Sequence, residues 1–153
     1  MHIVLYQPDI PQNTGTILRL AACLNLTVDI IEPCGFVWDD AKLKRSGMDY
    51  LDQVNVKKHM SWDVYLKQRD TNRRLILLTT KSDVVYTKCD FSPFDDLVLG
   101  SESKGAPIDI HEKADLRLAI PMNPNARSLN VAISCALVVG EALRQLDAFP
   151  RSA

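Results

Sequence analysis

The sequence is poor in the residues that build metal centres and disulfide frameworks. Its three histidines stand far apart, with no His-x-x-x-His or Glu-x-x-His spacing, so we assign them neither a metal nor a catalytic role. Its four cysteines form no Cys-x-x-Cys pair, and two of them, Cys23 and Cys135, lie in apolar stretches of helical pattern. We interpret the cysteines as small buried thiols of a reducing compartment, with a disulfide or a metal site as the alternative. The remaining residues of these two kinds are Cys34, Cys89, His2, His59 and His111.

Long apolar runs, a leader segment and a strong net charge are also missing. No apolar run approaches the roughly 20 residues that a membrane helix requires. Residues 1–6 contain neither a basic segment nor a cleavage site, so we expect no secretory signal and a cytoplasmic protein. The net charge of −1 over 153 residues argues against a strongly basic nucleic-acid-binding monomer.

The basic residues are nevertheless clustered along the chain. Each cluster is either a solvated face or, where two subunits bring several of them to one surface, part of an RNA track. The clusters are Lys42, Lys44 and Arg45; Lys57, Lys58 and His59; and Arg73 with Arg74.

Three common site motifs are absent as well. The chain has no G-x-x-x-x-G-K-[ST] phosphate loop and no G-x-G-x-x-G dinucleotide fingerprint. It also has no G-x-S-x-G elbow, which argues against an α/β-hydrolase. The pattern therefore gives no support to the common nucleotide-hydrolysing, dinucleotide-binding and serine-hydrolase classes.

The sequence does contain an alternation of apolar strands and amphipathic helices. Such alternation predicts an α/β fold with a mainly parallel sheet flanked by helices, and the length predicts one domain over residues 1–153. The predicted strands are Ile3–Tyr6, Thr27–Ile31, Val54–Lys57, Leu75–Thr79, Asp96–Leu99 and Leu116–Ile120. The predicted helices are Asn13 or Thr14 to Leu24, Asp39–Ser46, Ser61–Lys67 with Ser61 as cap, Pro107–Lys113 and Leu129–Leu146. Residues 7–13 hold two prolines, and we predict that they are not helical.

Three of these strands run directly into polar loops rich in small residues, at Leu75–Thr80, Leu97–Gly105 and Leu116–Asn130. Open α/β sheets bind ligands at the carboxyl ends of their strands. We therefore predict one composite pocket that grips a small molecule mostly with backbone groups. Glycines at 100 and 105 would permit positive φ angles and a close approach of the ligand, although a plain tight turn explains them equally well.

The last predicted helix is apolar on most of its surface, with only a thin polar stripe. A helix of this kind is buried by more than one partner, and a second subunit is a natural one. Gly140 inside it suggests a close backbone approach. The alternative is a helix that simply passes through the core of one chain.

Three polar residues have both a structural and a functional interpretation. Arg19 lies opposite the apolar face of its helix, either solvated or held at a cleft or subunit boundary to meet negative charge. Ser128 stands where the cap of the last helix is expected. Arg127 beside it could reach a phosphate.

The order N-T-G-x-x-x-R from Asn13 to Arg19, L-G-S-E-S-K-G from Leu99 to Gly105, and I-P-M…S-L-N-V from Ile120 to Val131 resembles the three motifs of the SPOUT-class (SpoU-like) RNA 2′-O-methyltransferases. The small single-domain members that modify the wobble nucleotide of tRNA are the nearest in pattern, and the resemblance covers nearly the whole chain. It implies a deep trefoil knot in the carboxyl-terminal half. It also implies a homodimer formed through the C-terminal and first helices.

The same resemblance implies a cofactor, a substrate and a site. The cofactor is S-adenosyl-L-methionine, released as S-adenosyl-L-homocysteine, with no metal, and the substrate is a tRNA anticodon stem-loop. The catalytic residues implied are Arg19, Arg127, Ser128 and Asn13. The cofactor-binding residues implied are Leu78, Thr79, Thr80, Gly100, Glu102, Gly105, Ile120, Met122, Ser128, Leu129 and Asn130. The RNA would be held by Lys42, Lys44, Arg45, Lys57 and Lys58.

Two positions depart from the pattern of the family. Ala132 stands where many relatives have Ser, and Lys104 replaces a common Arg. The resemblance implies transfer of a methyl group to the 2′-hydroxyl of the wobble cytidine or modified uridine of tRNA. An rRNA 2′-O-methyltransferase and a non-catalytic RNA- or nucleotide-binding module are the alternatives.

Overall fold

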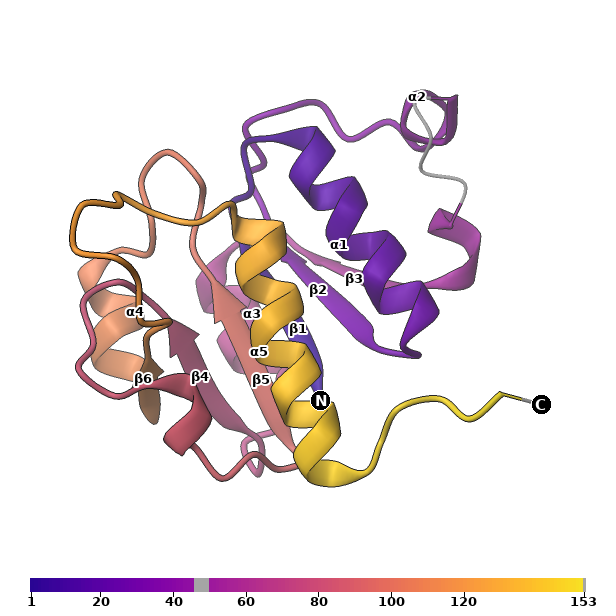
Figure 1. Ribbon diagram of the computed structural model, residues 1–153. Helices are drawn as coiled ribbons and strands as arrows, with labels where there is room; N and C mark the ends of the chain where they lie inside the picture. Colours follow the sequence, from indigo (N-terminus) through magenta and orange to yellow (C-terminus); the bar gives the residue numbers. More distant parts are fainter. Residues whose placement is uncertain (46–49, 153) are drawn as a thin grey trace.

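The computed structural model describes residues 1–45 and 50–152, and a six-stranded sheet forms its centre (Figure 1). All neighbouring strands are parallel, in the order β3-β2-β1-β5-β4-β6. This confirms the predicted α/β fold with a parallel sheet flanked by helices. The strands are β1 (His2–Tyr6), β2 (Thr27–Ile31), β3 (Asn55–His59), β4 (Arg74–Leu78), β5 (Asp95–Leu99) and β6 (Leu116–Leu118).

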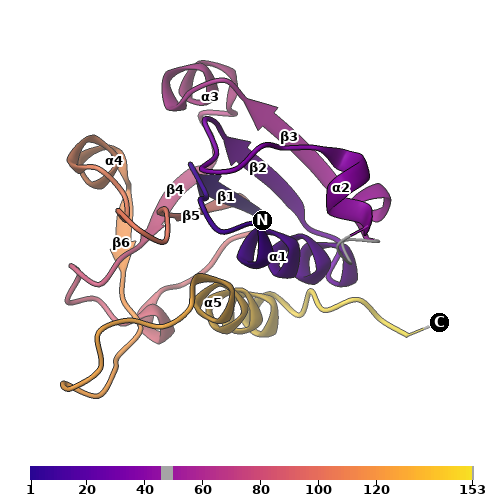
Figure 2. The same ribbon diagram turned by 90° about the horizontal axis from the view of Figure 1, so that it is seen from above.

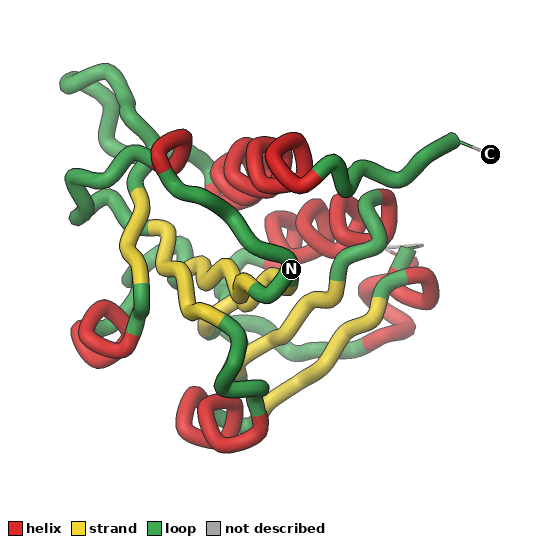
Figure 3. Tube along the Cα trace, turned by 90° about the horizontal axis from the view of Figure 1, so that it is seen from below, coloured by secondary structure: helices red, strands yellow, loops and turns green. Residues whose placement is uncertain are grey.

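The helices cover both faces of this sheet. Figure 2 shows α1 and α5 on one face, with α3 and α4 on the other, and Figure 3 shows the same layers from the opposite side. A parallel sheet needs this double cover because its strands are apolar on both sides. The helices are α1 (Pro11–Cys23), α2 (Asp40–Arg45), α3 (Trp62–Gln68), α4 (Ile108–Lys113) and α5 (Val131–Leu146), with short 3₁₀ turns η1 (Leu51–Gln53) and η2 (Tyr86–Lys88).

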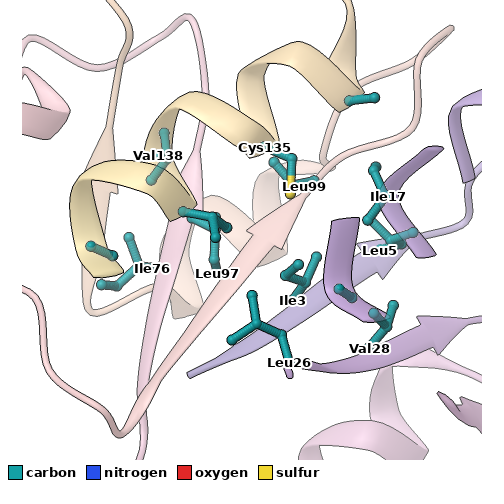
Figure 4. Close-up of a cluster of buried hydrophobic side chains, with 14 of the residues drawn as sticks. Ile3, Leu5, Ile17, Leu26, Val28, Ile76, Leu97, Leu99, Cys135 and Val138 are labelled. Atoms are coloured by element: carbon teal, nitrogen blue, oxygen red, sulfur yellow. The ribbon is translucent and has the colours of Figure 1, made fainter. Parts of the chain in front are cut away.

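The larger hydrophobic core lies between the sheet and the helix pair α1 and α5 (Figure 4). Ile3 and Leu97 point from the sheet toward these helices, where they meet Ile17 of α1 and Val138 of α5. All four side chains are essentially inaccessible to solvent. A second core on the opposite face packs Tyr65 of α3 and other apolar side chains against the sheet. The two cores hold the strands rigidly, so that the loops at their ends are presented from a fixed frame.

Two helix beginnings differ from the prediction. Helix α1 begins at Pro11, with Ile10 as its cap and no side-chain capping hydrogen bond, so neither Asn13 nor Thr14 caps it. Residues 11–13, predicted not to be helical, are therefore helical. Proline fits the first helical position because its missing N–H has no partner there in any case. Ser61 does cap α3, as predicted, by accepting a hydrogen bond from the backbone N–H of Val64 at 3.1 Å.

Helix α5 is likewise capped by a different residue from the one predicted. It begins at Val131, and the Asn130 side chain accepts hydrogen bonds from the N–H groups of Ala132 at 2.8 Å and Ile133 at 3.3 Å. Asparagine is among the strongest capping residues, since its carbonyl reaches the free N–H groups of the first turn. The prediction that Ser128 caps this helix is wrong.

The connection from β6 to α5 crosses the carboxyl end of the sheet. Strand β6 pairs with β4 at one edge, whereas α5 packs beside α1 (Figure 2). Residues 119–130 therefore lead back across the ends of β4 and β5. Because all strands are parallel, the loops that follow β1, β4, β5 and β6 all lie at the carboxyl end of the sheet.

The environment of the cysteines differs in part from the prediction. Cys89 and Cys135 are buried and Cys34 is half-buried, but Cys23 at the end of α1 is exposed. All four are free thiols. Burial raises the pKa of the Cys135 thiol to about 12 and, as the leading cause, that of Cys34 to about 11, which keeps both protonated near neutral pH. Across the described residues, none of the helices is both long and apolar enough to span a membrane.

Candidate functional site

A cavity of about 510 Å³ lies at the carboxyl end of the sheet, between the loops after β4, β5 and β6 and the first turns of α5. This is the edge where open parallel sheets hold ligands, and the volume is in the range of pockets for small molecules. Its wall includes all eleven residues that the sequence motifs suggested for cofactor binding. They are Leu78, Thr79, Thr80, Gly100, Glu102, Gly105, Ile120, Met122, Ser128, Leu129 and Asn130.

The loop after β5 folds into a tight turn that shapes one wall. Ser101 and Gly105 exchange backbone hydrogen bonds, with the N–H of Gly105 donating to Ser101 at 2.8 Å. Gly105 has a φ of +67°, a conformation that favours glycine. A Cβ on Gly100 would lie 2.5 Å from the backbone nitrogen of Ala106, so a side chain there would open the turn. The backbone that closely approaches Gly100 thus belongs to the same loop.

Asn13 connects two other parts of the cavity wall. Its amide oxygen accepts a hydrogen bond from the Asn130 side chain at 2.9 Å, and its amide nitrogen donates to Glu102 at 3.5 Å. Because α1 begins before it, Asn13 is not used as a cap and its amide faces the cavity. The sequence motif that contains Asn13 therefore meets the other two motifs in space.

Glu102 provides a carboxyl group to the cavity and is paired with Asp9, which follows β1. The backbone N–H of Asp9 donates to Glu102 at 2.9 Å, and the backbone N–H of Glu102 donates to Asp9 at 3.2 Å. Burial, the larger cause, and the neighbouring Asp9 raise the pKa of the Glu102 carboxyl above its usual value. Hydrogen bonds from Glu102 and from Ser103 hold the pKa of Asp9 below its usual value.

Both arginines suggested as catalytic lie outside this cavity. Arg19 is exposed on α1, with its guanidinium carbon 4.9 Å from the centre of the Tyr50 ring. Arg127 is exposed on the connection from β6 to α5. Ser128, next to it, lines the cavity, as does Asn13. One chain therefore brings together the cofactor set with Asn13 and Ser128, but neither arginine joins them.

The basic residues suggested for RNA binding lie on α2 and β3, at the β3 side of the sheet (Figures 1 and 2). The cavity is lined by the loops after β4, β5 and β6, toward the other side. Lys44 forms an ion pair with Asp52 at 2.8 Å, and the Lys58 ammonium lies 5.3 Å from the centre of the Trp38 ring. Lys57 is exposed on β3, and Lys42 is exposed on α2. The side chain of Arg45 lies outside the described residues. Within one chain this set does not surround the cavity.

Several wall residues were not assigned to the site from the sequence. Ile10, Lys81, His111 and Ser134 line the cavity, and Lys104, noted above only as a departure from the family pattern, lines it too. Ile10 and Lys81 directly adjoin strand-end loops, which is a signal that could have found them. His111 lies in α4 and enters the wall through tertiary packing, so no local pattern identifies it.

The cavity has the chemistry of a site for an organic ligand. Leu78, Leu99 and Ile120 offer apolar surface, while Asn13 and Glu102 offer polar groups. A search of the described residues for three or more His, Cys, Asp or Glu side chains able to hold one metal ion finds no such group.

Comparison with known proteins identifies the family to which this chain is similar. The sequence model of the SpoU rRNA methylase family matches residues 1–140. The tRNA (cytidine(34)-2′-O)-methyltransferase of Beijerinckia indica is 51% identical over 150 residues, which cover 97% of this chain and 94% of that protein. The enzyme of the same name from Escherichia coli K12 is 40% identical over 148 residues, covering 95% and 94%.

A solved structure agrees with these sequences. A protein studied for the 2′-OH methylation of C/U34 on tRNA superposes with a TM-score of 0.88 at 36% identity, over 95% of this chain and 90% of its own. The matched residues include the loops that line the cavity and the helix that carries Arg19. The chain belongs to the SpoU methylase family.

Proposed function

We propose that this protein transfers a methyl group from S-adenosyl-L-methionine to the ribose 2′-hydroxyl of nucleotide 34 in tRNA. The observation that carries the proposal is the cavity, in which residues from all three family motifs meet. The relatives named for methylation of cytidine 34 match over nearly their whole length, which supports the choice of substrate. Since tRNA is the substrate, the proposed place of action is the cytoplasm.

The residues around the cavity fit such a cofactor. Leu78 and Ile120 offer contact to an adenine ring, and the small residues of the turn leave backbone groups free to bind its edges. The carboxyl of Glu102 offers negative charge to a cationic ligand. When bound, S-adenosyl-L-methionine supplies an electrophilic methyl group on a sulfonium. Glu102 and the backbone of residues 100–105 would hold and orient it.

Arg19 is the proposed catalytic residue. A ribose hydroxyl is a poor nucleophile until its proton is lost, and a guanidinium, with a pKa above about 12, is a poor base. Arg19 therefore acts as a fixed positive charge that orients the hydroxyl and stabilises negative charge on its oxygen. Asn13, Arg127 and Ser128 would help to place the nucleotide.

A homodimer through α5 and α1 is part of the proposal. Exposed Ile133 and Leu137 lie one turn apart on α5, and exposed Leu129 lies just before the helix; we call these three residues the apolar stripe on α5. A Cβ on Gly140 would meet nothing within 4 Å among the described residues, so the close approach predicted there is not made within the chain. The open, apolar face is what supports a second copy as its partner. In such a dimer, Arg19 of one subunit would serve the cavity of the other.

We also propose that the carboxyl-terminal half forms the deep trefoil knot of SPOUT-class enzymes, within a single domain spanning residues 1–153. The return of residues 119–130 across the ends of β4 and β5 supports this. For RNA binding we propose the basic residues on α2 and β3, contributed by two subunits. Such contacts to phosphates weaken steeply as salt increases.

The decisive experiment is a methyl-transfer assay. Protein and labelled S-adenosyl-L-methionine are incubated with tRNA and, separately, with rRNA from a strain that lacks this protein, and the modified nucleotide is mapped. We expect label on the 2′-oxygen of nucleotide 34, and a strong loss of rate for Arg19→Lys, which keeps the charge but lacks the planar fork. Label on rRNA alone would favour the alternative suggested by the family's description. No binding of the cofactor at all would favour a non-catalytic module.

A mixing experiment tests the role of Arg19 across subunits. Arg19→Ala has an intact cavity, and Glu102→Ala has an intact Arg19. If Arg19 serves the partner's cavity, mixed dimers recover one complete site in two, so an equal mixture regains about a quarter of wild-type activity. A mixture as inactive as the two separate variants would refute the trans arrangement, provided that exchange of subunits is verified by mass.

A further inference from the structure

We propose that Asp9 is a positioning residue that holds Glu102, and with it the turn of residues 100–105, in the shape that binds the cofactor. The inference deepens the proposed function and rests on it. Asp9 does not line the cavity, and it lies 93 residues before Glu102 in the chain. Its role therefore has to be exerted through Glu102 and its neighbours.

The first step of the argument is the reciprocal geometry of the pair. Each residue donates its backbone N–H to the other's carboxyl group, at 2.9 Å to Glu102 and 3.2 Å to Asp9. The Ser103 hydroxyl also donates to Asp9. The Asp9 carboxyl thus accepts from two consecutive residues of the turn, which fixes the turn's position against the loop after β1. Hydrogen bonds to charged groups are worth more than neutral ones.

The second step is the support behind Asp9. A Cβ on Gly35 would lie 2.4 Å from the Cβ of Asp9, and the N–H of Gly35 donates to the carbonyl of Pro8 at 2.9 Å. The loop after β2 therefore packs closely against Asp9. A displacement of Asp9 would have to move this second loop as well.

The third step concerns the other hydrogen bond that the Glu102 carboxyl accepts. Its carboxyl also accepts from Asn13, and Asn13 accepts from Asn130, the cap of α5. A shift of Glu102 would therefore disturb the contacts between the three motifs that surround the cavity. Asp9 acts on the whole wall through one carboxyl group, although it touches no ligand itself.

The test measures binding of S-adenosyl-L-homocysteine and S-adenosyl-L-methionine by calorimetry. We expect Asp9→Ala to raise both dissociation constants about tenfold, since it removes two accepted hydrogen bonds. Asp9→Asn keeps an acceptor oxygen and should stay within about threefold of wild type. Ser103→Ala, an exposed and structurally mild change, should cost about threefold. Asp90→Ala is the control, because Asp90 is exposed on the connection that leads into β5, at the amino end of the strands and away from the cavity.

The double variant Asp9→Ala with Glu102→Ala distinguishes positioning from general destabilisation. If Asp9 acts through Glu102, adding Asp9→Ala to Glu102→Ala should weaken binding by less than about twofold. The KM for the cofactor should rise in Asp9→Ala while the KM for tRNA stays at its wild-type value. Wild-type binding by both Asp9→Ala and Ser103→Ala, or fully additive losses in the double variant, would overturn the inference.

The same measurements separate this inference from the proposed function. Wild-type protein that binds the cofactor while the Asp9 variants behave as wild type refutes only the positioning role. Wild-type protein that binds neither compound refutes the proposed function, and the positioning role falls with it. Thermal unfolding of each variant shows whether it is folded, and Ser103→Ala carries the test if Asp9→Ala is not.

Discussion

Replacing Asn130 by alanine removes two distinct interactions with one side chain. The Asn130 oxygen caps α5 by accepting from Ala132 at 2.8 Å and Ile133 at 3.3 Å. The Asn130 nitrogen donates to the oxygen of Asn13 at 2.9 Å, which joins α5 to α1 across the cavity wall. The variant therefore loses a helix cap and a tertiary hydrogen bond together.

The magnitude follows from these two losses. A lost cap costs about 1 kcal/mol, and a tertiary hydrogen bond costs about 1 kcal/mol more. The free energy of unfolding should thus fall by about 2 kcal/mol, which for a chain of this length lowers the melting temperature by about 4–8 °C. Asn130→Ser keeps a capping oxygen but cannot reach Asn13, so it should lose only about half of this. Ser128→Ala should change stability by less than about 0.5 kcal/mol, since Ser128 caps no helix and is exposed.

Thermal unfolding at one protein concentration is the assay, because association makes the melting temperature depend on concentration. Equal losses for Asn130→Ala and Asn130→Ser would show that the cap contributes nothing. A wild-type melting temperature for Asn130→Ser would show that the contact with Asn13 contributes nothing. A loss for Ser128→Ala as large as for Asn130→Ala would refute the assignment of the cap to Asn130.

Two further predictions concern the turn after β5 and the buried polar groups beneath α3. Gly100→Ala should lower the free energy of unfolding by about 1–3 kcal/mol, and kcat/KM for methyl transfer by about a hundredfold, because its Cβ would meet backbone at 2.5 Å. Denaturant titration measures the first effect and the methyl-transfer assay the second. An unchanged kcat/KM would show that the shape of the turn is not needed for activity. The pKa of Asp29, which burial alone would raise, is lowered overall by hydrogen bonds from His2 and from His59, the latter at 2.7 Å. The contribution of Asp29 to stability is therefore complete above the unfolded pKa of about 3.9 and is lost as pH falls through the lower folded value. In Asp29→Asn, the free energy of unfolding measured against pH should lack this part of the loss at acid pH. Identical pH dependence in the wild type and the variant would contradict this.

The order of strands and helices along the chain could be predicted because it is a local property. Among the described residues, all six predicted strands and all five predicted helices lie near their predicted positions, since apolar runs bounded by polar turns suffice to indicate them. The predicted helix end at Ser46 lies outside these residues. The starts of α1 and α5 were misplaced because several capping residues stand close together at each. Helix α1 begins at Pro11, with Ile10 as its cap, and α5 is capped by Asn130, which also has a tertiary partner in Asn13.

The meeting of three loops at the cavity could be predicted from the strand pattern, and the residues of its wall from the resemblance to the family. Parallel strands bring their following loops to one edge, so the motif residues were expected to meet. The pairing of Asp9 with Glu102 could not be predicted, because it depends on the exact position of two loops far apart in sequence. The inclusion of His111 was missed for a similar reason, as α4 folds back on the cavity through packing alone.

The location of Arg19 bears most directly on how the enzyme would work. A positive charge that stabilises the reacting oxygen has to stand at the cavity, yet Arg19 is exposed on α1, outside the wall formed by its own chain. Its stacking on Tyr50 restrains the guanidinium before any partner is present. The apolar stripe on α5, next to α1, offers a surface through which a second copy could bring its cavity to this arginine. If Arg19 serves the partner's cavity as proposed, catalysis requires association, and activity should fall with the square of protein concentration once dimers dissociate.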